Sequence, residues 1–218
     1  MQKRVLMVMA ASVLFTSSNV FAEDSNWMVR LRAVHVGWVN ESDAIGALAV
    51  PANGIHLEDK VVPEVDISYF FTRNIAAELI LTYPQKHTVR VTQSAAVPPA
   101  FDAGSLRELP PTLTLQYHFM PDAQFRPYVG AGFNYTTFSK VDLAPLNAVT
   151  GGNNTIDRSN LGGALQVGFD YKVGANSYIN LDIKKLYIKT DLTNSALGKL
   201  STITGDPLLV GIGYGFKF

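Results

Sequence analysis

The chain has 218 residues, a formal net charge of zero and no cysteine, and 47% of its residues are apolar. This length suits one domain, and the sequence lacks the basic cluster with which nucleic-acid-binding proteins neutralise phosphates. Without cysteine there is neither a disulfide framework nor a thiolate for catalysis or metal binding. We therefore expect no nucleic-acid partner.

The beginning of the chain has the features of a secretory signal peptide. Two basic residues precede an apolar run over residues 5–15, which is shorter than the ~20 residues that a membrane-spanning helix needs. Ala22 then supplies the small side chain that signal peptidase requires. The sequence predicts a cleaved signal peptide over residues 1–22 and one exported domain over residues 23–218, in preference to an uncleaved N-terminal anchor.

Beyond the signal peptide, apolar residues recur at every second position in eight segments. This period of two predicts strands with one apolar face. The segments are residues 27–33, 64–71, 76–83, 112–119, 128–135, 164–171, 179–184 and 208–218. In the last segment the opposite face is mostly glycine, which suits a narrow barrel interior better than a surface in water.

The segments that connect these strands alternate between short and long. The short ones are residues 72–74, 120–126 and 174–177, and the long ones are about 40–60, 84–105, 139–159 and 191–205. This is the pattern of an outer-membrane barrel. The sequence therefore predicts an all-β fold, an eight-stranded antiparallel up-and-down transmembrane β-barrel with four long extracellular loops and short periplasmic turns. Its place is the outer membrane of a Gram-negative cell, with both termini periplasmic.

If the apolar faces contact lipid, the polar residues of the same strands point inward. Eight strands enclose only enough space for side chains, so inward charges must pair with one another. We expect a paired lumen plug with Arg30, Arg32, Asp66, Glu78 and Asp170 at its centre. The other inward residues expected in it are Gln116, His118, Asn134, Gln166, Asn180, Asp182, Lys184 and Lys217. The alternative is a gated ion path through the same network.

The chain shows no pattern typical of an enzyme or a metal protein. Its four histidines are scattered, and none has a serine and a carboxylate, or a second histidine, at a spacing typical of catalysis or metal binding. We therefore expect no catalytic residues, no metal site and no cofactor.

Three motifs resemble the outer membrane protein W (OmpW) family, which includes the AlkL-type hydrophobic uptake proteins. They are the run RPYVGAGFNYTTF at residues 126–138, the paired prolines within residues 109–112, and Asp206-Pro207 before the last strand. The resemblance covers about residues 23–218. It implies a porin-like channel for passive uptake of small hydrophobic molecules through a narrow apolar funnel, with lateral release into the membrane.

Candidate residues of the substrate path follow from strand parity and from the backbone chemistry of proline. Val34, Val36 and Phe138 have the parity of inward-facing residues in the upper funnel. Pro110 and Pro111 lack the backbone N–H and would weaken a barrel seam, which provides a lateral exit; alternatively, they only mark the start of the fourth strand.

The expected partners are outer-membrane lipid, small hydrophobic ligands and the barrel assembly machinery. The last of these would recognise the C-terminal strand, whose ending at Phe218 resembles the terminal signal of outer-membrane proteins. The alternative function is a structural, adhesive or receptor barrel without transport.

Overall fold

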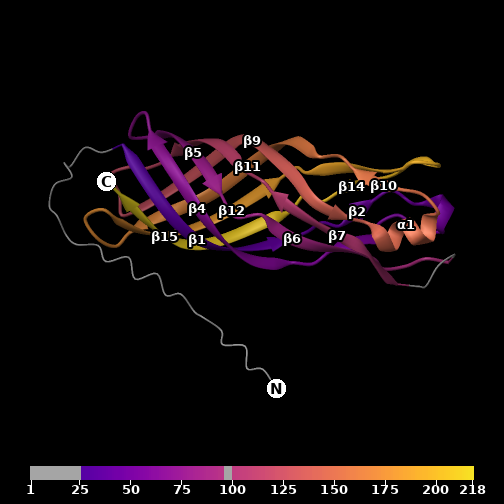
Figure 1. Ribbon diagram of the computed structural model, residues 1–218. Coiled ribbons are helices and arrows are strands. Elements are labelled where there is room, and N and C mark those ends of the chain that lie inside the picture. The colour runs from indigo at the N-terminus through magenta and orange to yellow at the C-terminus, as the bar shows by residue number, and fades with distance from the viewer. Residues whose placement is uncertain (1–25, 96–99) are drawn as a thin grey trace, which may run out of the picture.

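The computed structural model describes residues 26–95 and 100–218, so the predicted signal peptide lies outside the described residues. Its main feature is a closed wall of antiparallel strands (Figure 1). In order around the wall, these are β1 (Trp27–Gly37), β4 (Lys60–Phe70), β5 (Ile75–Leu81), β8 (Thr112–His118), β9 (Phe125–Asp142), β11 (Ser159–Lys172), β12 (Ser177–Leu186) and β15 (Leu208–Lys217). Each strand pairs with the next, and β15 pairs with β1, which closes the wall. The predicted eight-stranded β-barrel is therefore confirmed.

Side chains alternate between the outside and the inside of this wall. On β1, Arg30 and Arg32 are 0% and 3% exposed, whereas Leu31 between them is 62% exposed. Phe133 on β9 and Leu161 on β11 also lie on the outside, at 68% and 69% exposure. Such a band of exposed apolar side chains is the surface that transmembrane barrels present to lipid.

Aromatic side chains mark both ends of the apolar band. At the end where the chain terminates, rings of neighbouring residues meet edge to face. These pairs are Trp27–Tyr69, Tyr69–Phe71, Tyr117–Phe119 and Phe216–Phe218, with ring centroids 4.8 to 5.3 Å apart. Toward the other end, Tyr83, Tyr135 and Tyr187 are exposed. Amphipathic rings settle at the headgroup level, so the two sets delimit the membrane-spanning part of the wall.

The glycines of β15 lie where the barrel interior has no space for a larger side chain. A Cβ atom at Gly213 would lie 2.2 Å from the carbonyl oxygen of Leu31 and 2.7 Å from Cγ of Arg32. A Cβ atom at Gly215 would lie 2.6 Å from Cε of Met28. The glycine face of the last strand is therefore the inner face, packed against the long side chains of β1.

The four long connections are more regular than the sequence indicated, because each of them carries secondary structure. They contain β2 (Glu41–Ser42), η1 (Gly46–Leu48), β3 (Ile55–Leu57), β6 (Gln85–Val91), β7 (Phe101–Leu109), α1 (Ala144–Thr150), β10 (Asn154–Ile156), β13 (Lys189–Asn194) and β14 (Gly198–Thr204). Together they form an extension of the barrel at the end far from the C-terminus (Figure 1). Across the described ranges, no helix combines the length and the hydropathy needed to cross a bilayer.

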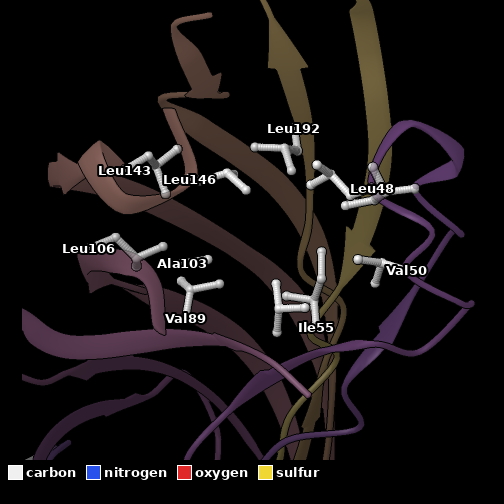
Figure 2. Packing of buried hydrophobic residues seen from close by; sticks show 11 residues of the cluster. Leu48, Val50, Ile55, Val89, Ala103, Leu106, Leu143, Leu146 and Leu192 are labelled. Atoms are coloured by element: carbon white, nitrogen blue, oxygen red, sulfur yellow. The ribbon is translucent and has the colours of Figure 1, made fainter. Parts of the chain in front are cut away.

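The extension has its own apolar core, which we call the outer cluster (Figure 2). Its buried residues are Ile45, Leu48, Val50, Ile55, Val89, Val91, Ala103, Leu106, Leu143, Leu146 and Leu192. They come from all four long connections, so the connections pack on one another. The β7–β9 pairing, which includes Leu109↔Thr137, joins this extension to the barrel wall.

Candidate functional site

The interior of the barrel is layered, and the inward side chains of β1 show the layers in order. Met28 belongs to a small apolar cluster near the chain terminus. Arg30 and Arg32 follow in a charged layer, and Val34 then lies in a second apolar cluster against which Val36 packs. A polar layer thus separates two apolar ones.

Arg30 is at the centre of the charged layer. Its Nη1 atom lies 2.6 Å from Oε2 of Glu78, and its Nε and Nη2 atoms donate to the two oxygens of Asp170 at 3.0 and 2.6 Å. Ser68 accepts a further hydrogen bond from Nη1 at 2.6 Å. The Asp170 contact is bidentate, which is the geometry that holds a guanidinium most firmly.

Arg32 occupies the next position of the charged layer. Its Nη1 atom lies 2.7 Å from Oδ2 of Asp66, a charge contact without hydrogen-bond alignment, and its Nε atom donates to Asn180 at 2.6 Å. The structure therefore brings together all five residues that the sequence proposed for the centre of the plug. Side chains fill this layer, as expected for eight strands.

The charged layer also contains three further residues that the sequence expected in the plug, together with Glu64, which it did not include. Lys184 of β12 contacts Glu64 and lies 3.0 Å from Asp182, and Gln166 donates to Asp182 at 2.8 Å. All of them are buried. Their inward parity was visible in the sequence, but their position next to the arginines depends on the register between distant strands. We call the whole charged layer the plug.

On the side of the plug that faces the extension lies a first cavity, which we call the inner cavity. Glu64 and Lys184 of the plug contribute to its wall. Its other lining includes the apolar side chains Val36, Val62 and Leu209. The cavity is therefore an apolar space that is bounded by charges on one side.

A second cavity, the outer cavity, continues into the extension. It is lined by residues of the outer cluster, among them Ile55, Leu106 and Leu192, and by Phe138. Trp38 and Glu108 line both cavities. The two cavities are thus neighbouring apolar spaces that share these two side chains.

The wall of the inner cavity contains a gap in strand pairing, which we call the seam. The β4–β5 ladder ends at Val65↔Leu81, although β4 continues to Lys60. Within the described residues, no strand pairs with residues 60–64 on this side, and residues 82–84, which run between β4 and Pro110 and belong to no strand, are also part of the seam. Thr82 Oγ1 donates a hydrogen bond to the Pro63 carbonyl at 2.9 Å. The exposed side chains of Val61 and Tyr83 lie next to the seam, and Tyr83 is one of the tyrosines at the end of the apolar band toward the extension, so the seam lies at that edge of the band.

Pro110 and Pro111 lie on the other side of the seam but have different positions. The carbonyl of Pro111 accepts a hydrogen bond from the Tyr135 amide at 3.0 Å, so Pro111 faces β9. Successive residues of an extended chain face opposite neighbours, so Pro110 faces the seam, where its nitrogen offers no donor. Pro110 lines the inner cavity, and Pro111 is not part of that lining.

The three remaining path residues all lie near the cavities. Val34 is fully buried between the plug and the inner cavity, Val36 lines the inner cavity, and Phe138 lines the outer one. The sequence missed Trp38, His87 and Glu108. His87 lies in a segment interpreted as a long loop, and Trp38 and Glu108 lie between the predicted strands and the long loops. The alternation of Val89 and Val91 with the polar residues Thr88 and Arg90 was the available sequence signal for the strand that carries His87.

The environment of Glu108 and His87 is apolar enough to change their protonation. Burial raises the pKa of Glu108 to about 8, against a smaller opposing effect of Lys60. Burial, together with the charge of Lys60, lowers the pKa of His87 to about 4. At neutral pH both side chains are therefore uncharged. In the described part of the chain, no group of three or more potential metal ligands occurs.

Comparison with known proteins agrees with this architecture. A family model described as the OmpW family matches residues 23–218. An uncharacterized outer-membrane protein, y4mB, of Sinorhizobium fredii is 39% identical over 93% of this chain and 84% of its own length. The dibenzothiophene metabolism operon protein PahQ of Pseudomonas aeruginosa is 29% identical over 93% of each chain. The crystal structure of OprG from Pseudomonas aeruginosa has a TM-score of 0.74 at 26% identity, covering 90% of this chain and 98% of OprG. The family match to residues 23–218 and the shared barrel show that this chain belongs to the OmpW family of outer-membrane β-barrels.

Proposed function

We propose that the barrel is a channel for passive uptake of small hydrophobic molecules. A molecule would enter the outer cavity, pass to the inner cavity, and leave through the seam into the membrane. The observation that carries this proposal is the position of the inner cavity, which is lined on one side by Glu64 and Lys184 of the plug and on another by Pro110 at the seam. The charged plug opposes onward passage of an apolar molecule, because such a molecule gains nothing from displacing paired charges.

The chemistry of the cavities and the name of one relative support this substrate class. Apolar molecules are stabilised where apolar side chains replace water around them, as they do in both cavities. PahQ is named for an operon of dibenzothiophene metabolism, and dibenzothiophene is a largely apolar aromatic compound. The resemblance to AlkL-type proteins noted in the sequence implies the same class.

The same proposal fixes the orientation of the barrel and its route of assembly. Uptake through the extension requires that the extension face the outside, so both termini are periplasmic. The C-terminal strand would then present Phe218 to the barrel assembly machinery from the periplasm, as its terminal aromatic position implies.

The test compares uptake of an apolar compound by vesicles whose outer leaflet is lipopolysaccharide, with and without the barrel. Val62→Trp would fill the inner cavity, because Val62 lines it and is 5% exposed. Val61→Trp is the matched control, because the adjacent side chain faces lipid at 69% exposure. We expect the wild-type protein and Val61→Trp to accelerate uptake and Val62→Trp to lose the effect.

The second candidate function is a structural, adhesive or receptor barrel, which the long ordered extension also suits. Equal uptake with and without the wild-type barrel, across several apolar compounds, would favour this alternative. The same uptake by Val62→Trp as by wild type would refute a path through the inner cavity.

A further inference from the structure

The boundary between the two apolar cavities is polar. Trp38 and Glu108 line both cavities, and the rings of Trp38 and His87 meet edge to face, with centroids 5.1 Å apart and an interplanar angle of 85°. Thr190 of β13 lines the outer cavity together with Trp38 and Glu108. We call these four residues the waist. They come from four separate stretches of the chain, and strands β6, β7 and β13 hold three of them.

The polar atoms of the waist lack partners in the protein. Nε1 of Trp38, Nδ1 of His87 and Oγ1 of Thr190 are buried, and none of them has a hydrogen-bond partner within the described residues. Glu108 as a residue is 4% exposed, and no hydrogen bond or ion pair joins its carboxyl group to another described residue. Buried polar groups are normally paired, and leaving one unpaired is costly. Four side chains without hydrogen-bond partners among the described residues, at the boundary of two cavities, indicate a binding site rather than a packing defect.

We propose that the waist binds the neutral oxygen of a molecule that is otherwise apolar, such as an alcohol, an aldehyde or a ketone. The inference rests on the proposed function for the way in which the molecule arrives, but it concerns binding and not transport. A pure hydrocarbon would fill the cavities while the waist atoms stayed unpaired.

The hydrogen-bond chemistry of the four groups selects this class. The indole Nε1 of Trp38 can only donate, so the ligand must carry an acceptor, which an ammonium group lacks. The hydroxyl of Thr190 and a protonated Glu108 can both donate and accept, so they suit a hydroxyl as well as a carbonyl. A carboxylate ligand would have to lose its hydration inside an apolar cavity, which is far more costly than for a neutral oxygen.

The apolar lining of both cavities defines the rest of the ligand. Beyond the waist, Val62 and Leu209 line the inner cavity and Leu106 and Leu192 line the outer one. A ligand with one oxygen at the waist would therefore place a hydrocarbon body against these side chains. The uncharged state of Glu108 near neutral pH, which burial favours by raising its pKa to about 8, agrees with a neutral partner.

The two tryptophans of the chain make a direct binding test possible. Trp27 lies in the aromatic ring set near the terminus and Trp38 at the waist, so Trp27→Phe leaves Trp38 as the single fluorescent reporter. Bromine quenches tryptophan on contact, and 1-bromo-2-octanol and 1-bromooctane differ only by a hydroxyl group, which in the alcohol lies on the carbon next to the bromine-bearing one. Titration into this variant in lipid nanodiscs, with ligand concentrations expressed per lipid, separates site affinity from simple partitioning. We expect tighter quenching by the bromoalcohol.

Substitutions at the waist then assign the preference to its residues. In the Trp27→Phe background, Glu108→Leu and Thr190→Val each remove one hydrogen-bonding group. We expect each substitution to lower the affinity for the bromoalcohol about 2- to 10-fold and to leave the affinity for 1-bromooctane unchanged. Glu108→Gln keeps a neutral hydrogen-bonding group of the same shape and should retain the preference. The altered migration of folded barrels in unheated gels verifies that each variant is folded.

Each outcome of the titration decides the inference. Equal affinity of the Trp27→Phe variant for the two ligands would overturn the proposed binding site while leaving hydrophobic uptake intact. An equal loss of affinity for both ligands in Glu108→Leu would also overturn it. Absence of quenching by both would overturn it as well, because the waist would then be closed to ligands. Selective quenching without any uptake through the barrel would support the binding site and contradict the transport function.

Discussion

Arg30 and Asp170 are 140 positions apart in the sequence, and two parallel hydrogen bonds of 3.0 and 2.6 Å join them inside the barrel. They lie on β1 and β11, which are not neighbours in the wall, so this contact spans the lumen. Glu78 on β5 contacts the same guanidinium. The side chain of Arg30, on β1, thus links its own strand to β5 and β11 across the interior.

Removal of this arginine should destabilise the barrel strongly. Arg30→Met leaves Glu78 and Asp170 buried without their cation, and breaking a buried pair in this way costs about 3–5 kcal/mol. Urea unfolding in lipid vesicles measures the loss. The control is Arg73→Met, which breaks an ion pair with Asp122 whose side chains are 80% and 78% exposed and should change stability by less than ~1 kcal/mol. Similar effects of the two substitutions would contradict a stabilising role for the plug.

The inner face of β15 should not tolerate even a methyl group. Gly213→Ala would place a Cβ atom 2.2 Å from the Leu31 carbonyl oxygen, so the wall or Arg32 must shift, at a cost of about 1–3 kcal/mol. The matched control is Gly163→Ala, where the nearest atom would be Cδ2 of Tyr187 at 3.4 Å. The midpoints of urea unfolding compare the two variants. Unchanged stability of Gly213→Ala would show that the interior is wider than the structure has it.

The two prolines at the seam should differ in their effect on uptake. Pro110→Thr adds a backbone donor that faces the seam, and one extra hydrogen bond across it should slow uptake about 2- to 10-fold. Pro111→Thr adds a donor that faces β9, where the Tyr135 amide already pairs, and should leave uptake nearly unchanged. The rates in lipopolysaccharide-bearing vesicles provide the measurement. A larger effect of Pro111→Thr would place the exit elsewhere.

The terminal phenylalanine should matter more for assembly than for stability. In the folded barrel the Phe218 amide donates to the Trp27 carbonyl at 3.0 Å, and its ring lies 5.3 Å from that of Phe216. Deletion of Phe218 removes little of the strand pairing, so spontaneous folding into detergent should be nearly normal. Insertion by the purified assembly machinery should be slower than for wild type. Equal insertion rates would argue against recognition at this residue.

The proposed orientation can be tested on intact cells. Gly151 follows α1 with a left-handed φ of 69°, and a Cβ atom built there meets no other atom within 4 Å. A short epitope inserted after Gly151 should therefore be tolerated and should be stained by antibody on intact cells. An epitope after Phe218 should be stained only when the outer membrane is permeabilised. The opposite staining would reverse the orientation and with it the direction of uptake.

The sequence predicts the barrel well because its strands have one face toward lipid and one toward a crowded interior. This requirement produces long alternations, as in Leu208 to Phe218, and it also places Arg30 and Arg32 inside. Which carboxylates meet these arginines depends on pairings across the lumen, and sequence parity alone does not give them. The contact of Lys184 with Glu64, and with it the place of Glu64 in the plug, therefore came only with the structure.

The extension is harder to predict from sequence for a different physical reason. Its strands are short, and β3, for example, has three residues, too few to establish a period. The waist shows the same limit: nothing in the residues around Glu108 indicates that its carboxyl group is buried without a partner. That property arises because four separated segments meet there.

The outer cluster draws side chains from every long connection, including Ile55, Leu106, Leu146 and Leu192 from the first to the fourth. With periplasmic termini, each connection reaches the cell exterior only after its own two strands have crossed the bilayer. The outer cluster therefore cannot form completely until the last strand hairpin has crossed the bilayer. In the proposed orientation, the connectivity thus sets an order of events in biogenesis, in which the wall inserts first and the extension packs last.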